Sequence, residues 1–188
     1  MSYLFNCYSG VYDKFMKVFH LQETLIIEDY LNHKNLMILD IGGGTGTLAD
    51  KLQRNGHSVT ILDSSEAMLK QAKKKNDQLI LIHSLLKENL NIPKQDIIIC
   101  RDCFHHLTNQ KDSLRIMINY LKENGELIIH DFQPTSLRIK LLFLFERCCF
   151  EKITPITSSR LEELCKQLDL KISFLYLGKW DYICKITI

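Results

Sequence analysis

The sequence has few of the features that mark fibrous, membrane-spanning or nucleic-acid-binding chains. Its 188 residues include only 8 Gly and 3 Pro, too few for a collagen-like or low-complexity chain. The 24 Lys and Arg nearly balance the 22 Asp and Glu, so no basic excess points to nucleic acid. The longest apolar run, Leu141–Phe145, is far shorter than the ~20 residues that cross a bilayer. These absences favour a globular domain without a nucleic-acid partner or a membrane span.

Cysteine is present, but its number and spacing predict no disulfide or zinc-binding framework. There are 7 Cys, an odd number, and no second pair at zinc-finger spacing accompanies the Cys100-x-x-Cys103 pair. Because this pair ends an apolar run, we expect thiols buried near a strand end rather than redox or metal chemistry. The N-terminal segment also lacks the basic and apolar regions of a secretory signal. Both observations predict a reducing, cytoplasmic location.

What the chain does contain is a regular alternation of strand-like and helix-like segments. Short apolar runs rich in β-branched residues predict strands, and apolar residues at i, i+3, i+4 and i+7 predict helices. This alternation is typical of an α/β, Rossmann-like doubly wound sheet that is mostly parallel. The predicted strands are 37–41, 58–63, 79–82, 96–100 and 125–132, and the predicted helices are 12–32, 45–55, 64–75, 110–122 and 135–150.

The C-terminal part adds a helix and a hairpin. Ser159 and Glu162 have the spacing of a capping box at the start of a helix. Two strand-like runs, KISFLYL and YICKITI, flank the turn GKWD and predict an antiparallel hairpin. At this length we expect a single domain, 1–188, with 1–34 as an N-terminal helical cap and 134–157 as a lid-like insertion.

A glycine-rich loop follows the first predicted strand, and two acidic residues indicate its ligand. Glycines at 42–44 and 46 let the backbone turn sharply and approach a ligand closely. Asp40 directly precedes the loop, where a carboxylate gains little from pyrophosphate but makes a charge-assisted contact with an ammonium group. Asp63 ends the second strand, where it can accept hydrogen bonds from ribose hydroxyls. A nucleoside with a cationic amino-acid tail therefore fits better than a dinucleotide.

These motifs resemble those of the class I S-adenosylmethionine-dependent methyltransferases. The group most similar in character contains the ubiquinone and menaquinone biosynthesis enzymes and many other small-molecule methyltransferases. The resemblance implies a seven-stranded sheet of order 3-2-1-4-5-7-6, with an antiparallel C-terminal hairpin, and S-adenosyl-L-methionine as cofactor. The segments that carry it are LDIGGGTG (39–46), LDSSEAML (62–69), DIIICRDCFHHL (96–107) and NGELIIHDF (124–132).

The resemblance also implies which residues bind the cofactor. One position departs from the family, because Ser84 stands where the family usually places an Asp that contacts the adenine. The implied cofactor-binding residues are Tyr12, Asp40, Gly42, Gly44, Gly46, Asp63, Ser64, Ser84 and Arg101.

Candidate catalytic residues lie near the predicted ends of later strands. Methyl transfer from a sulfonium is an in-line displacement, which needs a base only where the acceptor must lose a proton. His130 and His106 are the catalytic candidates, with a packing role as the alternative for each. We expect His105 to be solvated, and His130 and Asp131 to point to opposite faces of an extended strand. No metal site is predicted, because the histidines lack a helical H-x-x-x-H spacing.

The acceptor side is predicted from apolar segments outside the parallel strands. Aromatic and aliphatic residues of Tyr8–Phe15 and of 137–150 predict a small, partly apolar methyl acceptor. We expect a monomer or a homodimer. The alternatives are an RNA or protein methyltransferase and a non-catalytic S-adenosylmethionine-binding regulator. An NAD(P)-dependent oxidoreductase is least favoured, because we find no Tyr-x-x-x-Lys set beyond the fourth strand.

Overall fold

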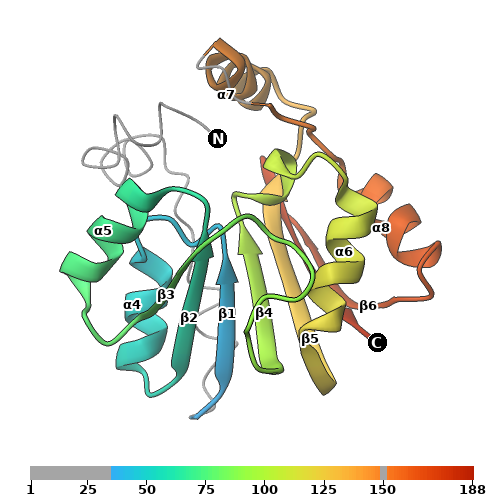
Figure 1. The fold of residues 1–188 in the computed structure, drawn as a ribbon. Helices are drawn as coiled ribbons and strands as arrows, with labels where there is room; N and C mark the ends of the chain where they lie inside the picture. The colour runs from blue at the N-terminus through green and yellow to red at the C-terminus, as the bar shows by residue number, and fades with distance from the viewer. Residues whose placement is uncertain (1–34, 149–151) are drawn as a thin grey trace. The chain divides into compact units, whose positions relative to one another are not determined.

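The structure is a computed structural model that describes residues 35–148 and 152–188. The helix predicted at 12–32, and with it the predicted cap, lies outside the described residues. The sheet has seven strands in the order β3-β2-β1-β4-β5-β7-β6, and β7 runs antiparallel to both of its neighbours (Figure 1). The predicted fold class and strand order are therefore confirmed.

The chain divides into two compact units, and the first of them ends at Leu85. Helices α4 and α5 both pack against β2 (Figure 1), through apolar faces that include the buried Leu48, Leu52 and Ala72. Pairing of Asp63 with His83 brings the ends of β2 and β3 to one edge of the sheet. The described elements of this unit are β1 (Met37–Ile41), α4 (Thr47–Arg54), β2 (Ser58–Asp63), α5 (Glu66–Lys75) and β3 (Ile80–His83).

The second unit, Leu86–Ile188, is built around a long central strand. β5 pairs in parallel with β4 and antiparallel with β7, while α6 packs against β5 and α8 against β6 and β7. The elements are β4 (Gln95–Arg101), the 3-10 helix η1 (Phe104–His106), α6 (Gln110–Asn119), β5 (Leu121–Phe132), α7 (Leu137–Cys148), α8 (Ser158–Lys166), β6 (Lys171–Leu177) and β7 (Asp181–Thr187).

Two local predictions in this unit are wrong. The helix predicted to end at residue 122 ends at Asn119, because Leu121 already pairs with Gln95 as part of β5. The capping box of Ser159 and Glu162 does not form. Instead the hydroxyl of Thr157 accepts a hydrogen bond from the backbone N–H of Arg160, so α8 begins before the predicted cap.

The prediction of buried thiols near the end of β4 is confirmed for Cys100, whereas Cys103 is half-buried. Neither forms a disulfide among the described residues. Two further free thiols are buried where α8 meets the hairpin. Burial, with the nearby Glu162 as a second cause, raises the pKa of Cys165 to about 11. Burial also raises the pKa of Cys184 to about 12, and the neighbouring Cys165 and Glu162 act in the same direction. These two thiols are therefore inert at neutral pH.

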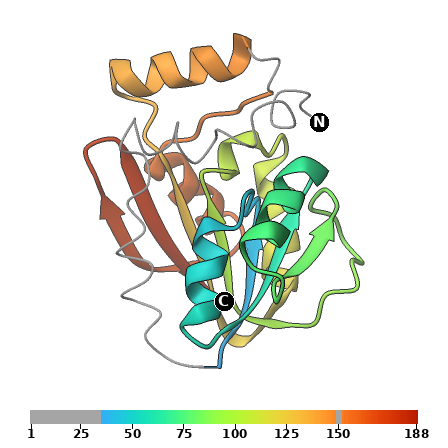
Figure 2. The ribbon, with the colours of Figure 1, turned by 90° about the vertical axis from the view of Figure 1, so that its left-hand side faces the viewer.

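Helix α7 lies beyond the carboxyl end of β5 (Figures 1 and 2). One of its faces is buried through Ile139 and Phe143. Another face carries Leu137, Leu141 and Leu144 with exposed fractions of 74%, 57% and 56%. These spacings of three and four residues give α7 a packed side and an apolar exposed side.

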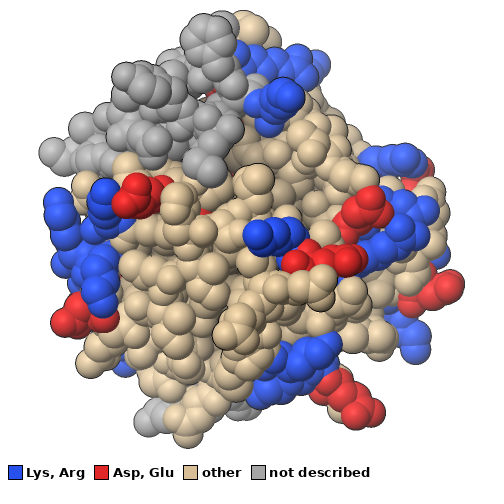
Figure 3. All heavy atoms as spheres, viewed as in Figure 1, with Lys and Arg blue, Asp and Glu red and all other residues tan. Residues whose placement is uncertain are grey.

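The surface charges are mixed on the face shown in Figure 3, where acidic and basic side chains alternate. The lysines of α5 are mostly exposed and make local contacts, such as the ion pair between Lys70 and Glu66 and the bond from Lys73 to the Asp77 carbonyl. Within the described residues, no helix is both long and apolar enough to cross a membrane.

Candidate functional site

The glycine loop between β1 and α4 is folded closely over Asp40. The Gly42 N–H donates to the Leu62 carbonyl at 2.8 Å, which fixes the loop to β2. A Cβ at Gly43 would lie 2.6 Å from Oδ2 of Asp40, so no side chain fits there. Asp40 itself is only 2% exposed. The loop thus needs glycine where the predicted ammonium-binding carboxylate lies beneath it.

Asp63 holds the other side of this loop. Its Oδ2 accepts the Gly44 N–H at 2.9 Å and its Oδ1 accepts the Ser65 N–H at 2.7 Å. Burial raises the pKa of Asp63 above its usual value, although the bonds from Ser65 and Gly44 act in the opposite direction. Each carboxylate oxygen has a second lone pair, so Asp63 can still accept hydrogen bonds from ribose hydroxyls. The residues present therefore fit an adenosine ligand.

The first unit brings together most of the other residues predicted to bind the cofactor. Gly46 donates its N–H to the Gly43 carbonyl at the start of α4. The carbonyl of Ser64 contacts the ring of His83 at 3.1 Å. Ser84 donates its N–H to the Asp63 carbonyl and its hydroxyl to the Leu85 carbonyl. An adenine contact by Ser84 stays a prediction.

Two predicted cofactor-binding residues lie elsewhere. Tyr12 lies outside the described residues. Arg101 ends β4 in the second unit, with its Nε 3.6 Å from Oδ2 of Asp102.

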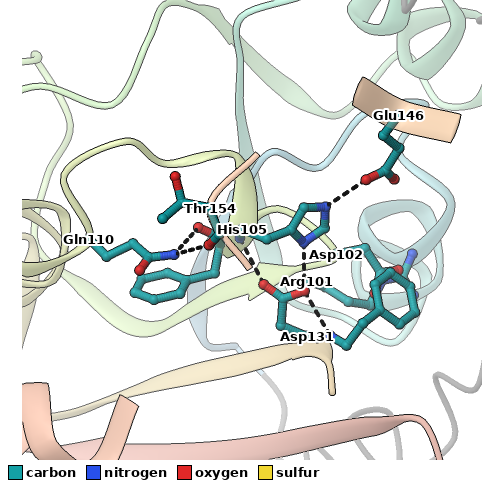
Figure 4. A network of polar contacts seen from close by, with 9 residues as sticks. Arg101, Asp102, His105, Gln110, Asp131, Glu146 and Thr154 are labelled. Carbon is teal, nitrogen blue, oxygen red and sulfur yellow. Dashed lines mark hydrogen bonds and ion pairs between the residues drawn. The ribbon is translucent and has the colours of Figure 1, made fainter. Parts of the chain in front are cut away.

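His105 is the centre of a polar network in the second unit, and the expectation that it is solvated is wrong. It is 1% exposed, because η1 folds it back onto the end of β5. Asp131 accepts the His105 backbone N–H at 2.8 Å and lies 2.6 Å from ring Nδ1 (Figure 4). Burial lowers the pKa of His105. The charge and hydrogen bond of Asp131, together with the charge of Glu146, outweigh this effect and hold the pKa well above its usual value.

Glu146 and His106 complete this cluster. Glu146 reaches His105 from α7, on the side of the ring away from Asp131 (Figure 4), with Oε2 3.6 Å from Nε2. The rings of His105 and His106 have centroids 4.2 Å apart. Burial, with the charge of His105 as a further cause, lowers the pKa of His106 to about 3. His106 is therefore neutral at physiological pH.

His130 makes a second pair of imidazole and carboxylate. Its Nε2 lies 2.8 Å from Oδ2 of Asp181, which begins β7. His130 and Asp131 thus have different partners, on β7 and on η1, as expected for adjacent residues of a strand that point to opposite faces. Both side chains are buried. No local sequence pattern pointed to Asp181 or Glu146, because each meets its partner only through the tertiary fold.

The ends of β4 and β5 also hold buried polar atoms for which the described residues provide no hydrogen-bond partner. Such atoms are uncommon in folded proteins, where a water, an ion or a polar ligand usually supplies the missing partner. They are Nη1 of Arg101, Oδ1 of Asp102, Nε2 of His105, Nδ1 of His130 and Oε2 of Glu146, together with the hydroxyl of Tyr182 on β7.

The fold is that of a methyltransferase domain. The sequence matches the methyltransferase domain family over residues 13–173, so the chain belongs to that family. Its sheet order and glycine loop are those expected of the class I S-adenosylmethionine-dependent methyltransferases that the sequence motifs resemble.

Curated and solved relatives agree with this assignment. The chain is 28% identical over 151 residues to the mitochondrial ubiquinone biosynthesis O-methyltransferase of Schizosaccharomyces pombe, which covers 76% of this chain and 54% of that protein. The chain thus spans about half the length of the curated relatives it matches. An S-adenosylmethionine-dependent methyltransferase from Clostridium acetobutylicum has a TM-score of 0.77 at 16% identity, covering 97% of this chain and 99% of that one.

Magnesium protoporphyrin IX methyltransferase from Synechocystis, solved with bound SAH, has a TM-score of 0.67 at 19% identity. The superposition covers 86% of this chain and 77% of that one. At these identities, the two structural matches show a shared fold.

Asp63→Asn should weaken binding of S-adenosylhomocysteine by about 10-fold or more, because one hydrogen bond to a charged group contributes ~1.5–3 kcal/mol. Isothermal calorimetry with the purified protein measures this. The exposed Asp77→Asn is the matched control and should bind as the wild type does. Equal affinity in wild type and Asp63→Asn would show that this carboxylate does not hold the ribose.

Gly44→Val should abolish S-adenosylhomocysteine binding and leave the chain folded. A Cβ at Gly44 has no atom closer than 3.8 Å, so valine would fill open space above the loop, where the ligand is expected. The positive φ of Gly44 adds a cost of about 1–2 kcal/mol. Gly44→Ala carries the same backbone strain with less bulk and serves as control. An intact circular dichroism spectrum with unchanged affinity in Gly44→Val would make the loop a structural turn only.

Proposed function

We propose that the protein transfers a methyl group from S-adenosyl-L-methionine to an oxygen of a small, partly apolar metabolite by in-line displacement. The observation that carries this proposal is the group of unpartnered buried polar atoms beside aromatic side chains in the second unit. The cofactor, when bound, supplies an electrophilic methyl group. The residues of the chain then have to orient the acceptor, exclude water and take up a proton.

The polar atoms suit an acceptor that carries hydroxyl or carbonyl groups. Arg101 Nη1 is a donor and Asp102 Oδ1 is an acceptor, while the Tyr182 hydroxyl can be either. An acceptor with both kinds of group would satisfy donors and acceptors that the described residues leave unpaired. The O-methyltransferase named among the relatives supports oxygen as the methylated atom.

The apolar side of the acceptor is suggested by the surroundings of His105. The ring of Phe143 lies 5.1 Å from that of His105, and the ring of Phe132 lies 6.0 Å from it. The exposed leucines of α7 add further apolar surface. Covering such surface contributes about 25 cal/mol per Å², so a ring or chain on the acceptor would strengthen binding.

His130 is the residue we propose as base. An ionised carboxylate only accepts hydrogen bonds, so Asp181 places the ring proton of His130 on Nε2 and the lone pair on Nδ1. Nδ1 is buried and has no hydrogen-bond partner among the described residues. It would take the proton of an acceptor hydroxyl as the O–CH3 bond forms and the S–CH3 bond breaks. The products are a methyl ether and S-adenosylhomocysteine, and the proton then passes to solvent.

His106, the other catalytic candidate from the sequence, suits a different role. An imidazole with a pKa of about 3 is a weak base. A general base works best when its pKa lies near the pH of the reaction, so His106 is a poor general base near neutral pH. We therefore propose that His106 acts near the acceptor without transferring a proton.

The cysteines give evidence on the cellular compartment of the reaction. The free thiols of the described residues support a reducing compartment such as the cytoplasm. Whether the protein is a monomer or a homodimer stays a prediction.

A methyl-labelled cofactor tests the function. The purified protein is incubated with labelled S-adenosyl-L-methionine and separate pools of phenolic and hydroxylated metabolites, total RNA and denatured protein. We expect label in an organic-extractable small molecule, as a methyl ether. Label in RNA or protein alone would contradict the metabolite class. Tight cofactor binding without label in any pool would instead indicate a regulator.

His130→Gln should lower kcat on that acceptor by about 10²–10⁴-fold, the usual contribution of a general base. Binding of S-adenosylhomocysteine should not change, because His130 is assigned to the acceptor's proton. Asp181→Asn should also lower kcat, and the exposed Asp169→Asn is its matched control. A kcat for His130→Gln within about 3-fold of wild type would exclude this residue as base.

A further inference from the structure

The two sides of the His105 ring face two carboxylates. Asp131 lies 2.6 Å from Nδ1 and, when ionised, can only accept a hydrogen bond, so Nδ1 carries the ring proton. In the neutral ring, Nε2 then has a lone pair, and this lone pair faces Oε2 of Glu146, another acceptor. Nε2 and Oε2 are both buried, and neither has a hydrogen-bond partner among the described residues. Two such acceptor atoms need a cation between them, which is either a proton on Nε2 or a metal ion.

The distance between these atoms favours a metal ion over a shared proton. Nε2 and Oε2 lie 3.6 Å apart, beyond the ~3.2 Å limit of an ordinary N–H···O hydrogen bond. Ligands bound at about 2.0–2.2 Å in tetrahedral geometry lie about 3.4 Å from each other. The observed separation is therefore close to that of two ligands of one ion.

His106 supplies a third ligand atom. One ligand atom from each of His105, His106 and Glu146 lies within 4.8 Å of the other two. A neutral imidazole nitrogen is the usual metal ligand of histidine, and His106 offers one at this distance. The hydrogen bond from His105 to Asp131 reproduces the carboxylate–histidine–metal arrangement that orients metal-bound histidines.

The site is built from segments that other contacts hold in place. Thr154 donates its N–H to the His105 carbonyl at 2.6 Å, and Gln110 donates to the carbonyls of Thr154 and Phe104 (Figure 4). Glu146 comes from α7, whose side chain Phe143 packs beside the His105 ring. These contacts hold His105 and the backbone of η1 in place before any ion binds, as a metal site requires.

We propose that His105, His106 and Glu146 bind one divalent transition-metal ion, with Asp131 as the positioning residue behind His105. Two histidines and one carboxylate are the ligand set of catalytic zinc sites, and such sites keep a position open for water or substrate. A role in catalysis rests on the proposed function: a second polar group of the acceptor would occupy the open position, while its reacting hydroxyl faces His130.

Metal titration of the chelator-treated full chain tests the site. Calorimetry with Zn²⁺ should show one ion bound per chain. Co²⁺ serves as a spectroscopic probe, because nitrogen and oxygen ligands give d–d bands without the thiolate charge-transfer band that a cysteine site would add. Glu146→Gln and His106→Gln should each weaken Zn²⁺ binding at least ~10-fold, the low end of the loss for a group that only supports a ligand. Thermal unfolding checks that both variants fold.

The exposed Glu88→Gln is the matched control and should bind Zn²⁺ as the wild type does. Absence of Zn²⁺ binding by the wild type would overturn the site and leave a proton between His105 and Glu146. Equal binding by wild type and by both ligand variants would overturn it too, because the ion would then lie elsewhere.

The catalytic role is tested separately on the acceptor found with labelled cofactor. Chelation should lower methylation, Zn²⁺ or Co²⁺ should restore it, and S-adenosylhomocysteine binding should not change. Methylation that is insensitive to chelation would overturn the role of the ion. If no acceptor is methylated although the ion binds through these residues, the proposed function fails and the metal site stands.

Discussion

The carboxylate of Asp131 determines how the second unit is organised around its polar centre. It is fully buried and accepts hydrogen bonds from the His105 backbone, the His105 ring and the Phe132 backbone. The charge of His105 and these bonds, acting against burial, hold the pKa of Asp131 below its usual value. Removing one partner from a buried ion pair costs about 3–5 kcal/mol, because the other charge is left uncompensated. The turn after β4, the orientation of the imidazole and its approach to Glu146 all depend on this one group.

Most of the sheet could be predicted because its signals are local. β1 and β2 have the predicted bounds, since a buried parallel strand is a short β-branched run between turn residues. The glycine loop and Asp63 were predictable for the same reason. Their neighbours in sequence supply the strand, the turn and the helix start that place them. The two hydrogen bonds that Asp63 accepts come from residues of the loop and of the following turn.

The predictions failed where the partner is distant in sequence or where two local patterns are equivalent. His105 was expected in solvent because no residue near it in the sequence covers its side chain. The residues that do cover it, Asp131 on β5 and Glu146 on α7, are distant in the sequence. The helix cap lies at Thr157 and not at Ser159 because three hydroxyl residues stand in succession, and each of them can start a helix. A tertiary contact selects among these caps, because the Gln133 side chain donates a hydrogen bond to the hydroxyl of Ser158 and so holds the start of α8 in place. Tertiary contacts thus decided the polar centre, while local patterns decided the sheet.

Helix α7 carries both an exposed apolar surface and the carboxylate that faces His105, so the two cannot change position independently. Ile139, Phe143 and Glu146 lie at intervals of four and three residues and share its packed side, while its leucines occupy another. A substitution that shifts the helix also shifts the carboxylate that faces His105. The fit of the proposed acceptor against the exposed leucines is thereby linked to the charge balance of a buried imidazole.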